Sequence, residues 1–164
     1  MKTNQALQHK IYTLDNLQRQ ATIWRMLGKK IVFTNGVFDV LHKGHIASLT
    51  EAASHGDVLV VAVNADASVK KLKGPTRPIN DEAARVLLLA SLLQTDAIII
   101  FEEDNPLQLI KAIMPDVLVK GGDYTLEQII GSKEVIAAGG KVIIAKIVDG
   151  ISSTIIIDKI NEQG

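Results

Sequence analysis

The chain has 164 residues, of which 47% are hydrophobic and 4% aromatic, and it contains no cysteine. This length suits one domain with its own core, and the lack of cysteine excludes disulfides, thiolate catalysis and cysteine-based zinc sites. Eighteen Lys and Arg residues balance eighteen Asp and Glu residues, which gives no support for a nucleic-acid partner or a membrane-surface protein. The N-terminus lacks the apolar core of a signal peptide and no apolar run approaches transmembrane length, so a cytoplasmic location is expected.

The first predicted element is a helical lead-in over residues 1–28, centred on residues 14–27. We expect it to pack on the region that follows, residues 29–164, or on a partner subunit. Its apolar residues suggest a homodimer, although packing against the core explains them equally well. Trp24 is expected to serve packing rather than ligand contact. The apolar residues of the lead-in are Leu14, Leu17, Ile23, Trp24 and Leu27.

Short apolar, β-branched runs recur along the rest of the chain and predict strands. Each run is nearly continuous rather than alternating, which is typical of strands that are buried on both faces of a parallel sheet. The predicted strands span residues 30–33, 58–63, 97–101, 117–119 and 142–148.

Apolar residues at helical spacing fill the intervals between these strands. Asn80 is expected to cap the second helix, and Pro106 occupies a first-turn position of the third. Because strands and helices alternate, the fold is predicted to be α/β, with a doubly wound, five-stranded parallel sheet and helices on both faces. The predicted helices span residues 44–55, 81–93, 106–113, 126–138 and 153–160.

Polar and glycine-rich segments follow the strands at one edge of the predicted sheet. Ligands of open parallel sheets bind beyond the carboxyl ends of the strands, so this edge is the predicted site. The connections at the opposite edge of the sheet are mostly short and contain glycine or proline. The segments at the predicted site edge are residues 35–45, Asn64 with Asp66, and residues 102–105, 120–124 and 149–154.

The stretch T-N-G-V-F-D-V-L-H-K-G-H, residues 34–45, carries the strongest chemical signal. A helix that begins near Gly44 directs its free N–H groups and positive dipole end toward the preceding loop, where phosphates bind readily. Gly36 allows a sharp turn off the strand and close approach of a ligand. His42 and His45 flank this position, where imidazoles can donate to phosphate oxygens.

Other interpretations of the histidine pair are weaker. The helical zinc pair normally has a spacing of four with a carboxylate, and no third His or Cys stands nearby. Neither a Walker motif nor the pattern G-x-G-x-x-G follows the first strand, which argues against a P-loop and against ordinary dinucleotide binding. A purely structural interpretation has to account for Gly36, Phe38, Asp39, Gly44 and both histidines at once.

The string G-V-F-D-V-L-H-K-G-H resembles the histidine–x–glycine–histidine signature of the nucleotidyltransferase superfamily, and I-S-S-T at residues 151–154 resembles its second signature. The resemblance implies a Rossmann-like domain over residues 29–164 with strand order 3-2-1-4-5. Longer strings, including V-A-V-N-A-D-A-S-V-K-K-L-K-G-P-T-R-P-I-N and L-V-K-G-G-D-Y, are similar to the adenylyltransferase domain of bifunctional heptose kinase/adenylyltransferases. No sugar-kinase domain is present, so a stand-alone form is expected.

This resemblance implies transfer of AMP from ATP to D-glycero-β-D-manno-heptose 1-phosphate, giving ADP-heptose and pyrophosphate for lipopolysaccharide core synthesis. The nucleophile is already an anion, so catalysis would consist of positioning and charge neutralisation. ATP is the expected co-substrate, with Mg²⁺ bridging its phosphates and no direct protein ligand to the metal. The residues expected to bind ATP are Asn35, Gly36, Phe38, His42, Gly44, His45, Lys120, Gly121, Gly122, Asp123, Ser152, Ser153 and Thr154.

The expected catalytic residues are His42, His45, Lys73 and Arg85. Lys73 belongs to a basic loop, Lys70–Arg77, that would clamp the phosphates, although a solvated basic loop is an equally plausible interpretation. Arg85 matches an arginine that reaches the active site in related cytidylyltransferases; otherwise it is an exposed helical cation. The residues expected to bind the sugar phosphate are Asp39, Asn64, Asp66, Lys73 and Arg77.

Two other functions remain open from the sequence. One is a cytidylyltransferase of the same superfamily that acts on a polyol or amino-alcohol phosphate. The other is a non-catalytic nucleotide-binding module, against which the intact histidine pair and terminal hydroxyl residues argue.

Overall fold

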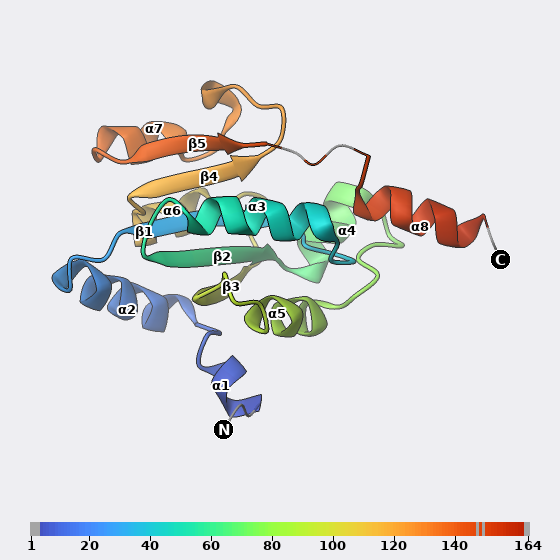
Figure 1. The fold of residues 1–164 in the computed structure, drawn as a ribbon, viewed down its shortest axis with the longest axis horizontal. Coiled ribbons are helices and arrows are strands. Elements are labelled where there is room, and N and C mark those ends of the chain that lie inside the picture. The colour runs from blue at the N-terminus through green and yellow to red at the C-terminus, as the bar shows by residue number, and fades with distance from the viewer. Residues whose placement is uncertain (1–3, 147, 149, 163–164) are drawn as a thin grey trace.

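The computed structural model describes residues 4–146, 148 and 150–162. Its centre is a five-stranded sheet in the order β3-β2-β1-β4-β5, and all neighbouring strands pair in parallel (Figure 1). The predicted α/β fold and strand order are therefore confirmed. The strands are β1 Ile31–Gly36, β2 Val58–Asn64, β3 Ala97–Phe101, β4 Val117–Gly121 and β5 Lys141–Ala145.

Helices cover both faces of this sheet, as a doubly wound fold requires. Residues of α2, α6 and α7 share one buried cluster with alternate strand residues such as Ile31 and Phe33. Residues of α3 and α5 share the second cluster with the intervening ones, such as Val32. The helices are α1 Asn4–Gln8, α2 Leu14–Met26, α3 Lys43–Ala53, α4 Asp66–Lys73, α5 Glu82–Ala90, α6 Leu107–Ile113, η1 Leu126–Gln128 (a 3₁₀ turn), α7 Ser132–Ala137 and α8 Ser153–Asn161.

The structure corrects several predicted boundaries. The basic segment expected as a loop begins as helix α4, which carries Lys73. The helix expected over 126–138 is broken into η1 and α7 at Gly131, which has a φ of +86°. Asp81, not Asn80, is the N-cap of α5, because its side chain accepts the Ala84 N–H at 2.8 Å.

The last predicted strand, residues 142–148, was also placed too far along the chain. β5 ends at Ala145, and residue 147 of the prediction lies outside the described residues.

The lead-in packs directly on the domain. Leu17 and Ala21 of α2 are fully buried in the core, and Trp24 packs against the same cluster, which confirms packing for Trp24. The segment before α2 also pairs with β3 through a parallel bridge between Ile11 and Ile98.

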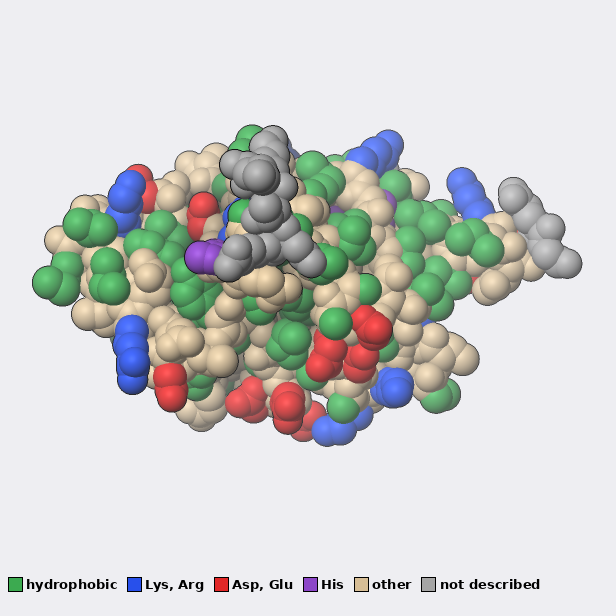
Figure 2. Space-filling model, turned by 90° about the horizontal axis from the view of Figure 1, so that it is seen from below, with side chains coloured by type: hydrophobic (Ala, Val, Ile, Leu, Met, Phe, Trp, Pro, Cys, Tyr) green, Lys and Arg blue, Asp and Glu red, His purple; other side chains and the backbone are tan. Residues whose placement is uncertain are grey.

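The outer face of α2 remains exposed, including Leu14 and Ile23, and so does its C-cap residue Leu27. Figure 2 shows hydrophobic side chains, mixed with charged ones, over the face that carries α1 and α2. The homodimer therefore stays a prediction. Among the described residues, no helix combines the length and apolar character needed to cross a membrane.

Candidate active site

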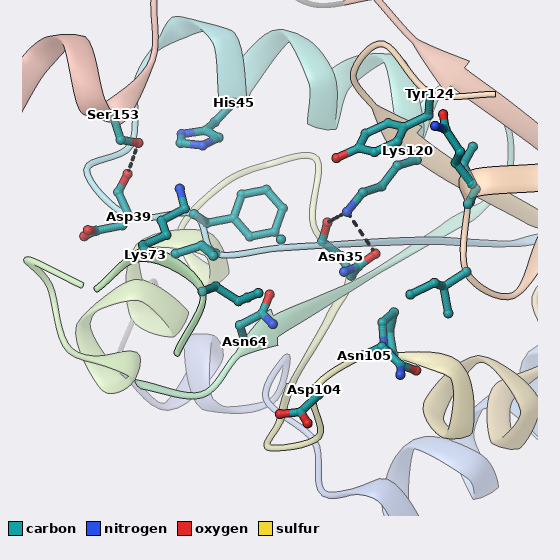
Figure 3. Close-up of a pocket in the computed structure, with 18 residues that line it drawn as sticks. Asn35, Asp39, His45, Asn64, Lys73, Asp104, Asn105, Lys120, Tyr124 and Ser153 are labelled. Atoms are coloured by element: carbon teal, nitrogen blue, oxygen red, sulfur yellow. Dashed lines mark hydrogen bonds between the residues drawn. The ribbon is translucent and has the colours of Figure 1, made fainter. Parts of the chain in front are cut away.

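A cavity of about 480 Å³ opens at the carboxyl edge of the sheet, where the predicted site lies (Figure 3). Its walls include the ends of β1, β2 and β4 and the N-terminal regions of α3 and α8. The expected site residues that line it are Asn35, Gly36, Phe38, Asp39, His45, Asn64, Lys73, Lys120 and Ser153.

The histidine pair is built into the start of α3. His42 is the N-cap, and its Nδ1 accepts the Gly44 N–H at 3.1 Å. The neutral ring of His42 therefore carries its proton on Nε2. The rings of His42 and His45 stack with centroids 3.9 Å apart, while Phe38 contacts His45 from another side at 5.5 Å between centroids. His45 lines the cavity, and His42 stands behind it.

Both imidazoles are held in the neutral form. Burial lowers the pKa of His42. Burial, followed by the nearby His42 and Lys73, lowers the pKa of His45 from 6.5 to about 4, although Asp39 opposes this shift. At neutral pH the pair can donate ring N–H groups to an anion without carrying charge themselves.

The second predicted signature meets the first at Gly44. A Cβ added to Gly44 would lie 3.0 Å from the His42 ring and 3.3 Å from Ile151, so the small residue allows the two segments to touch. Ser152 caps α8 by accepting the Ile155 N–H at 3.2 Å. Ser153 is buried and donates from its hydroxyl to the carbonyl of Asp39. Thr154 is exposed and lies outside the cavity wall.

Asp39 lines the cavity and makes several contacts with other groups of the protein. Its carboxylate is 1% exposed and accepts the N–H groups of Ile79 at 2.8 Å and Asn80 at 3.0 Å. It also pairs with the Arg77 guanidinium at 2.9 Å. Burial alone would raise the pKa of Asp39, but these hydrogen bonds and Arg77 together lower it. These contacts hold the loop, and sugar binding by Asp39 and Arg77 stays a prediction.

Arg85 is buried, so the alternative interpretation as an exposed helical cation is wrong. Its side chain is fully buried, and its guanidinium donates to the carbonyls of Val37 at 2.6 Å and Asn64 at 2.8 Å. It also pairs with Asp66 at 2.7 Å. Arg85 does not line the cavity, and its two carbonyl contacts join the segment after β1 to the end of β2. Asp66 is the acidic partner of Arg85, and its contact with sugar hydroxyls stays a prediction.

Lysines approach the cavity from α4 and from β4. Burial and the neighbouring Arg77 lower the pKa of Lys73, while Asp39 opposes the shift. Burial lowers the pKa of Lys120, and its ammonium donates to the backbone and side-chain oxygens of Asn35, at 3.3 and 3.4 Å. Within the described part of the chain, neither lysine forms a salt bridge.

The glycine-rich segment after β4 lies beside the cavity. Gly121, Gly122 and Asp123 are outside its wall. Gly122 has a φ of +137°, and a Cβ there would meet the Tyr124 ring at 2.4 Å. This glycine is required by the turn that brings Tyr124 to the cavity, which favours the conformational interpretation of Gly122.

Several wall residues were not among the expected site residues. The segments after β3 and β4 were recognised as polar clusters at the correct edge, so the strand-end rule was the available signal for Asp104, Asn105 and Tyr124. The apolar members carry no such signal. The additional wall residues are Val37, Leu72, Asp104, Asn105, Pro106, Tyr124, Gln128, Ile129 and Ile130.

The loop between β1 and α3 is conformationally strained. Phe38 and Val40, on either side of Asp39, have φ values of +52° and +49°. Left-handed backbone is unfavourable for side chains of this size, most of all for a β-branched one. The buried Asp39 contacts and the Ser153 hydroxyl hold the loop in this form.

The fold and this arrangement define a class of protein. Residues 33–159 match the family described as cytidylyltransferase-like, and the chain belongs to that family. Because the matched range contains both signature segments, the cavity belongs to the family's domain rather than to an addition.

The individual relatives are more specific. The chain is 50% identical to the bifunctional protein HldE of Caulobacter vibrioides over 93% of its length and 32% of the relative. It is 49% identical to HldE of Shigella sonnei, over 93% of this chain and 32% of that protein. The chain thus spans about a third of the length of these relatives.

Two solved structures share the fold of this chain. The lipopolysaccharide core biosynthesis protein from Thermoplasma volcanium is 32% identical with a TM-score of 0.59, covering 74% of this chain and 98% of that one. The pantoate-beta-alanine ligase from Francisella tularensis, solved with an ATP analogue and beta-alanine, has a TM-score of 0.57 over 93% of this chain and 77% of its own. At 19% identity it supports the fold alone.

Proposed function

We propose that the protein transfers AMP from ATP to D-glycero-β-D-manno-heptose 1-phosphate, giving ADP-heptose and pyrophosphate for lipopolysaccharide core synthesis. Identity of about 50% to HldE proteins along nearly the whole chain supports this substrate pair, as does the likeness to a lipopolysaccharide core biosynthesis protein. An ATP donor is in keeping with a cytoplasmic enzyme. Any additional activity of the longer relatives lies outside this assignment.

The observation that carries the proposal is the meeting of two helix N-termini at the stacked histidine pair. The helices α3 and α8 contribute backbone N–H groups and positive dipole ends at adjacent points of the cavity rim. His45, Lys73 and Ser153 line the wall beside them. These features support binding of a polyphosphate, and we expect the β- and γ-phosphates of ATP to bind here.

The reaction needs no covalent enzyme intermediate. An oxygen of the sugar phosphate attacks the α-phosphorus, a new P–O bond forms, and the bond to the bridging oxygen of the β-phosphate breaks. Pyrophosphate leaves with that electron pair, and the attacking oxygen has no proton to lose. The neutral His42 and His45 rings donate to oxygens on which charge develops, and Lys73 supplies a positive charge nearby.

Magnesium is proposed as a companion of ATP rather than as a resident ion. The described residues contain no group of three or more His, Cys, Asp or Glu side chains that could hold a metal. Asp39, the acidic group on the cavity wall beside His45, is already paired with Arg77. The residues fit an ion carried by the phosphates, whose charge would help neutralise the triphosphate.

A donor and acceptor screen tests the proposal. The protein is incubated with Mg²⁺, ATP or CTP, and heptose 1-phosphate, glycerol 3-phosphate or ethanolamine phosphate, and pyrophosphate and the nucleotide product are measured. We expect turnover with ATP and heptose 1-phosphate. Turnover with CTP and a polyol or amino-alcohol phosphate would instead identify a cytidylyltransferase. Nucleotide binding without turnover of any pair would identify a non-catalytic module.

A further inference from the structure

The cavity presents its positive charge at separate places. Lys73 stands with His45, Asp39 and Ser153 at one end, whereas Lys120 projects from β4 on the other side of the phenyl ring that Figure 3 shows between them. Neither ammonium has a carboxylate partner among the described residues. An unpaired cation in a partly dry cavity is unfavourable until an anion arrives.

Lys120 has neutral hydrogen-bond partners. Among the residues that the structure describes, its ammonium is anchored by long contacts to the carbonyl and side-chain oxygens of Asn35, and burial lowers its pKa. Neutral oxygens position the group without cancelling its charge. At the other end of the cavity, burial and the neighbouring Arg77 lower the pKa of Lys73, and Asp39 opposes this shift. Each end of the cavity therefore presents a cation to an additional negative group.

The geometry of phosphoryl transfer assigns an anion to each end. The leaving and attacking oxygens lie roughly in line on opposite sides of the phosphorus. If pyrophosphate leaves toward Ser153 and the N-terminus of α8, the attacking phosphate has to approach from the opposite end of the cavity. That end contains Lys120 and Asn35.

The wall beyond Lys120 suits a polyhydroxylated ligand. Asn105 and Gln128 each use their side-chain oxygen to accept a backbone N–H, from Leu107 at 3.1 Å and Thr125 at 2.8 Å. These bonds fix the amides and leave their NH₂ groups as donors for sugar oxygens. The ring of Tyr124 adds an apolar surface next to Lys120 (Figure 3).

We propose that Lys120 binds the phosphate of the acceptor sugar, and that Asn105, Tyr124 and Gln128 form the pocket for its hydroxyl-bearing part. This inference rests on the proposed function for its choice of acceptor, and it moves Lys120 from the nucleotide, where the sequence prediction had put it. Lys120 then binds the phosphate of the acceptor and not the phosphates of ATP.

Binding and kinetics on Lys120→Gln, Lys120→Arg and a control variant test this assignment. The control is Lys133→Gln, an exposed lysine on α7 away from the cavity. Heptose 1-phosphate is titrated into protein saturated with a non-hydrolysable ATP analogue, and the analogue is titrated separately. Thermal unfolding shows that each variant is folded.

We expect Lys120→Gln to weaken heptose 1-phosphate binding and raise its KM by about tenfold or more, while analogue binding changes less than about twofold. Lys120→Arg should recover part of the loss, and Lys133→Gln should match wild type. Equal weakening of both ligands, weakening of the analogue alone, or no change in either would overturn the assignment.

The outcomes separate this inference from the proposed function. Wild type that binds heptose 1-phosphate through Lys120 but forms no ADP-heptose would overturn the function and retain the acceptor site. Wild type that forms ADP-heptose with an unaltered Lys120→Gln variant would retain the function and overturn the site. Wild type that neither binds nor converts the sugar phosphate would overturn both.

Discussion

Aspartates stand at both edges of the sheet, yet they do different work. At the amino edge, Asp57, Asp96 and Asp116 each precede a strand and accept one backbone N–H from or next to the neighbouring strand, at 2.7–2.8 Å. At the carboxyl edge, Asp39 is buried and gathers Arg77 with the N–H groups of Ile79 and Asn80. The aspartates at the amino edge satisfy backbone N–H groups where strands begin, whereas Asp39 holds part of the cavity wall in place.

The comparison teaches that residue type alone does not mark a site. What distinguishes the carboxyl edge is the concentration of groups whose ionisation the fold disturbs: His42, His45, Lys73 and Lys120 all have lowered pKa values. Such clustering in a cleft is typical of functional sites. If the comparison is correct, substitutions at the carboxyl edge change turnover, and those at the amino edge change only stability.

The largest effect is expected for His45→Ala. Loss of a donor to developing charge should lower kcat by about 10²–10³, with little change in the unfolding temperature because the ring is only partly buried. The matched control is His9→Ala, which removes an exposed histidine near α1. Steady-state pyrophosphate release measures kcat of both variants. A wild-type kcat in His45→Ala would show that His45 takes no part in catalysis.

Asp39→Ala should damage both turnover and stability. It leaves the buried Arg77 without its carboxylate, which costs about 3 kcal/mol of unfolding free energy. It also releases the strained loop beside the histidine pair. Urea unfolding and kcat are measured together. An unchanged unfolding midpoint would show that the Asp39 contacts do not hold the carboxyl edge.

The stability of wild type should fall more steeply with acid than that of His45→Ala. Burial lowers the pKa of His45 from 6.5 to about 4, so the unfolded chain binds a proton that the folded chain does not. Stability from this group is complete above pH 6.5 and is lost as the pH falls toward 4. Urea unfolding at several pH values measures it, and a constant difference between the two proteins would contradict it.

Asp116→Ala tests the amino edge. It removes the acceptor of the Ile31 N–H at 2.7 Å and should cost about 1 kcal/mol of unfolding free energy, with kcat and both KM values unchanged. Urea unfolding and steady-state kinetics provide the two readouts. A loss of turnover comparable to that of Asp39→Ala would abolish the distinction between the edges.

The smallest effect is expected for Lys71→Ala. Its ion pair with Asp104 spans 3.1 Å, but the two side chains are 69% and 78% exposed. Water and salt screen such a pair, so unfolding free energy should change by less than about 0.5 kcal/mol. Differential scanning calorimetry at low and high salt measures it, and a large salt-dependent loss would mean that this rim contact stabilises the site.

The sequence allowed the sheet to be predicted because the strands are buried on both faces. Their apolar runs are continuous, and only the ends were wrong. β1 runs on to Gly36 because the polar Thr34 and Asn35 pair with Val61 and Ala62 of β2. Helix α4 was missed because most of its residues are polar, and Val69 is its fully buried apolar residue.

The site was predictable only where the chemistry is local. The histidine pair, Gly44 and Ser153 sit in short segments whose spacing carries the signal. The contacts of Arg85 with Val37 and Asn64 join residues 48 and 21 positions apart. No rule of sequence spacing predicts contacts between residues so far apart. The ion pair between Arg77 and Asp39 could not be predicted for the same reason.

The left-handed backbone at Phe38 and Val40 has one more consequence. A turn forced into this shape by the folded core is already in its working arrangement before substrate enters. The cost of organising the wall beside His45 is met once, when the chain folds, and not again in each catalytic cycle. Residues 37–41 should therefore keep the same backbone in crystals grown with and without nucleotide.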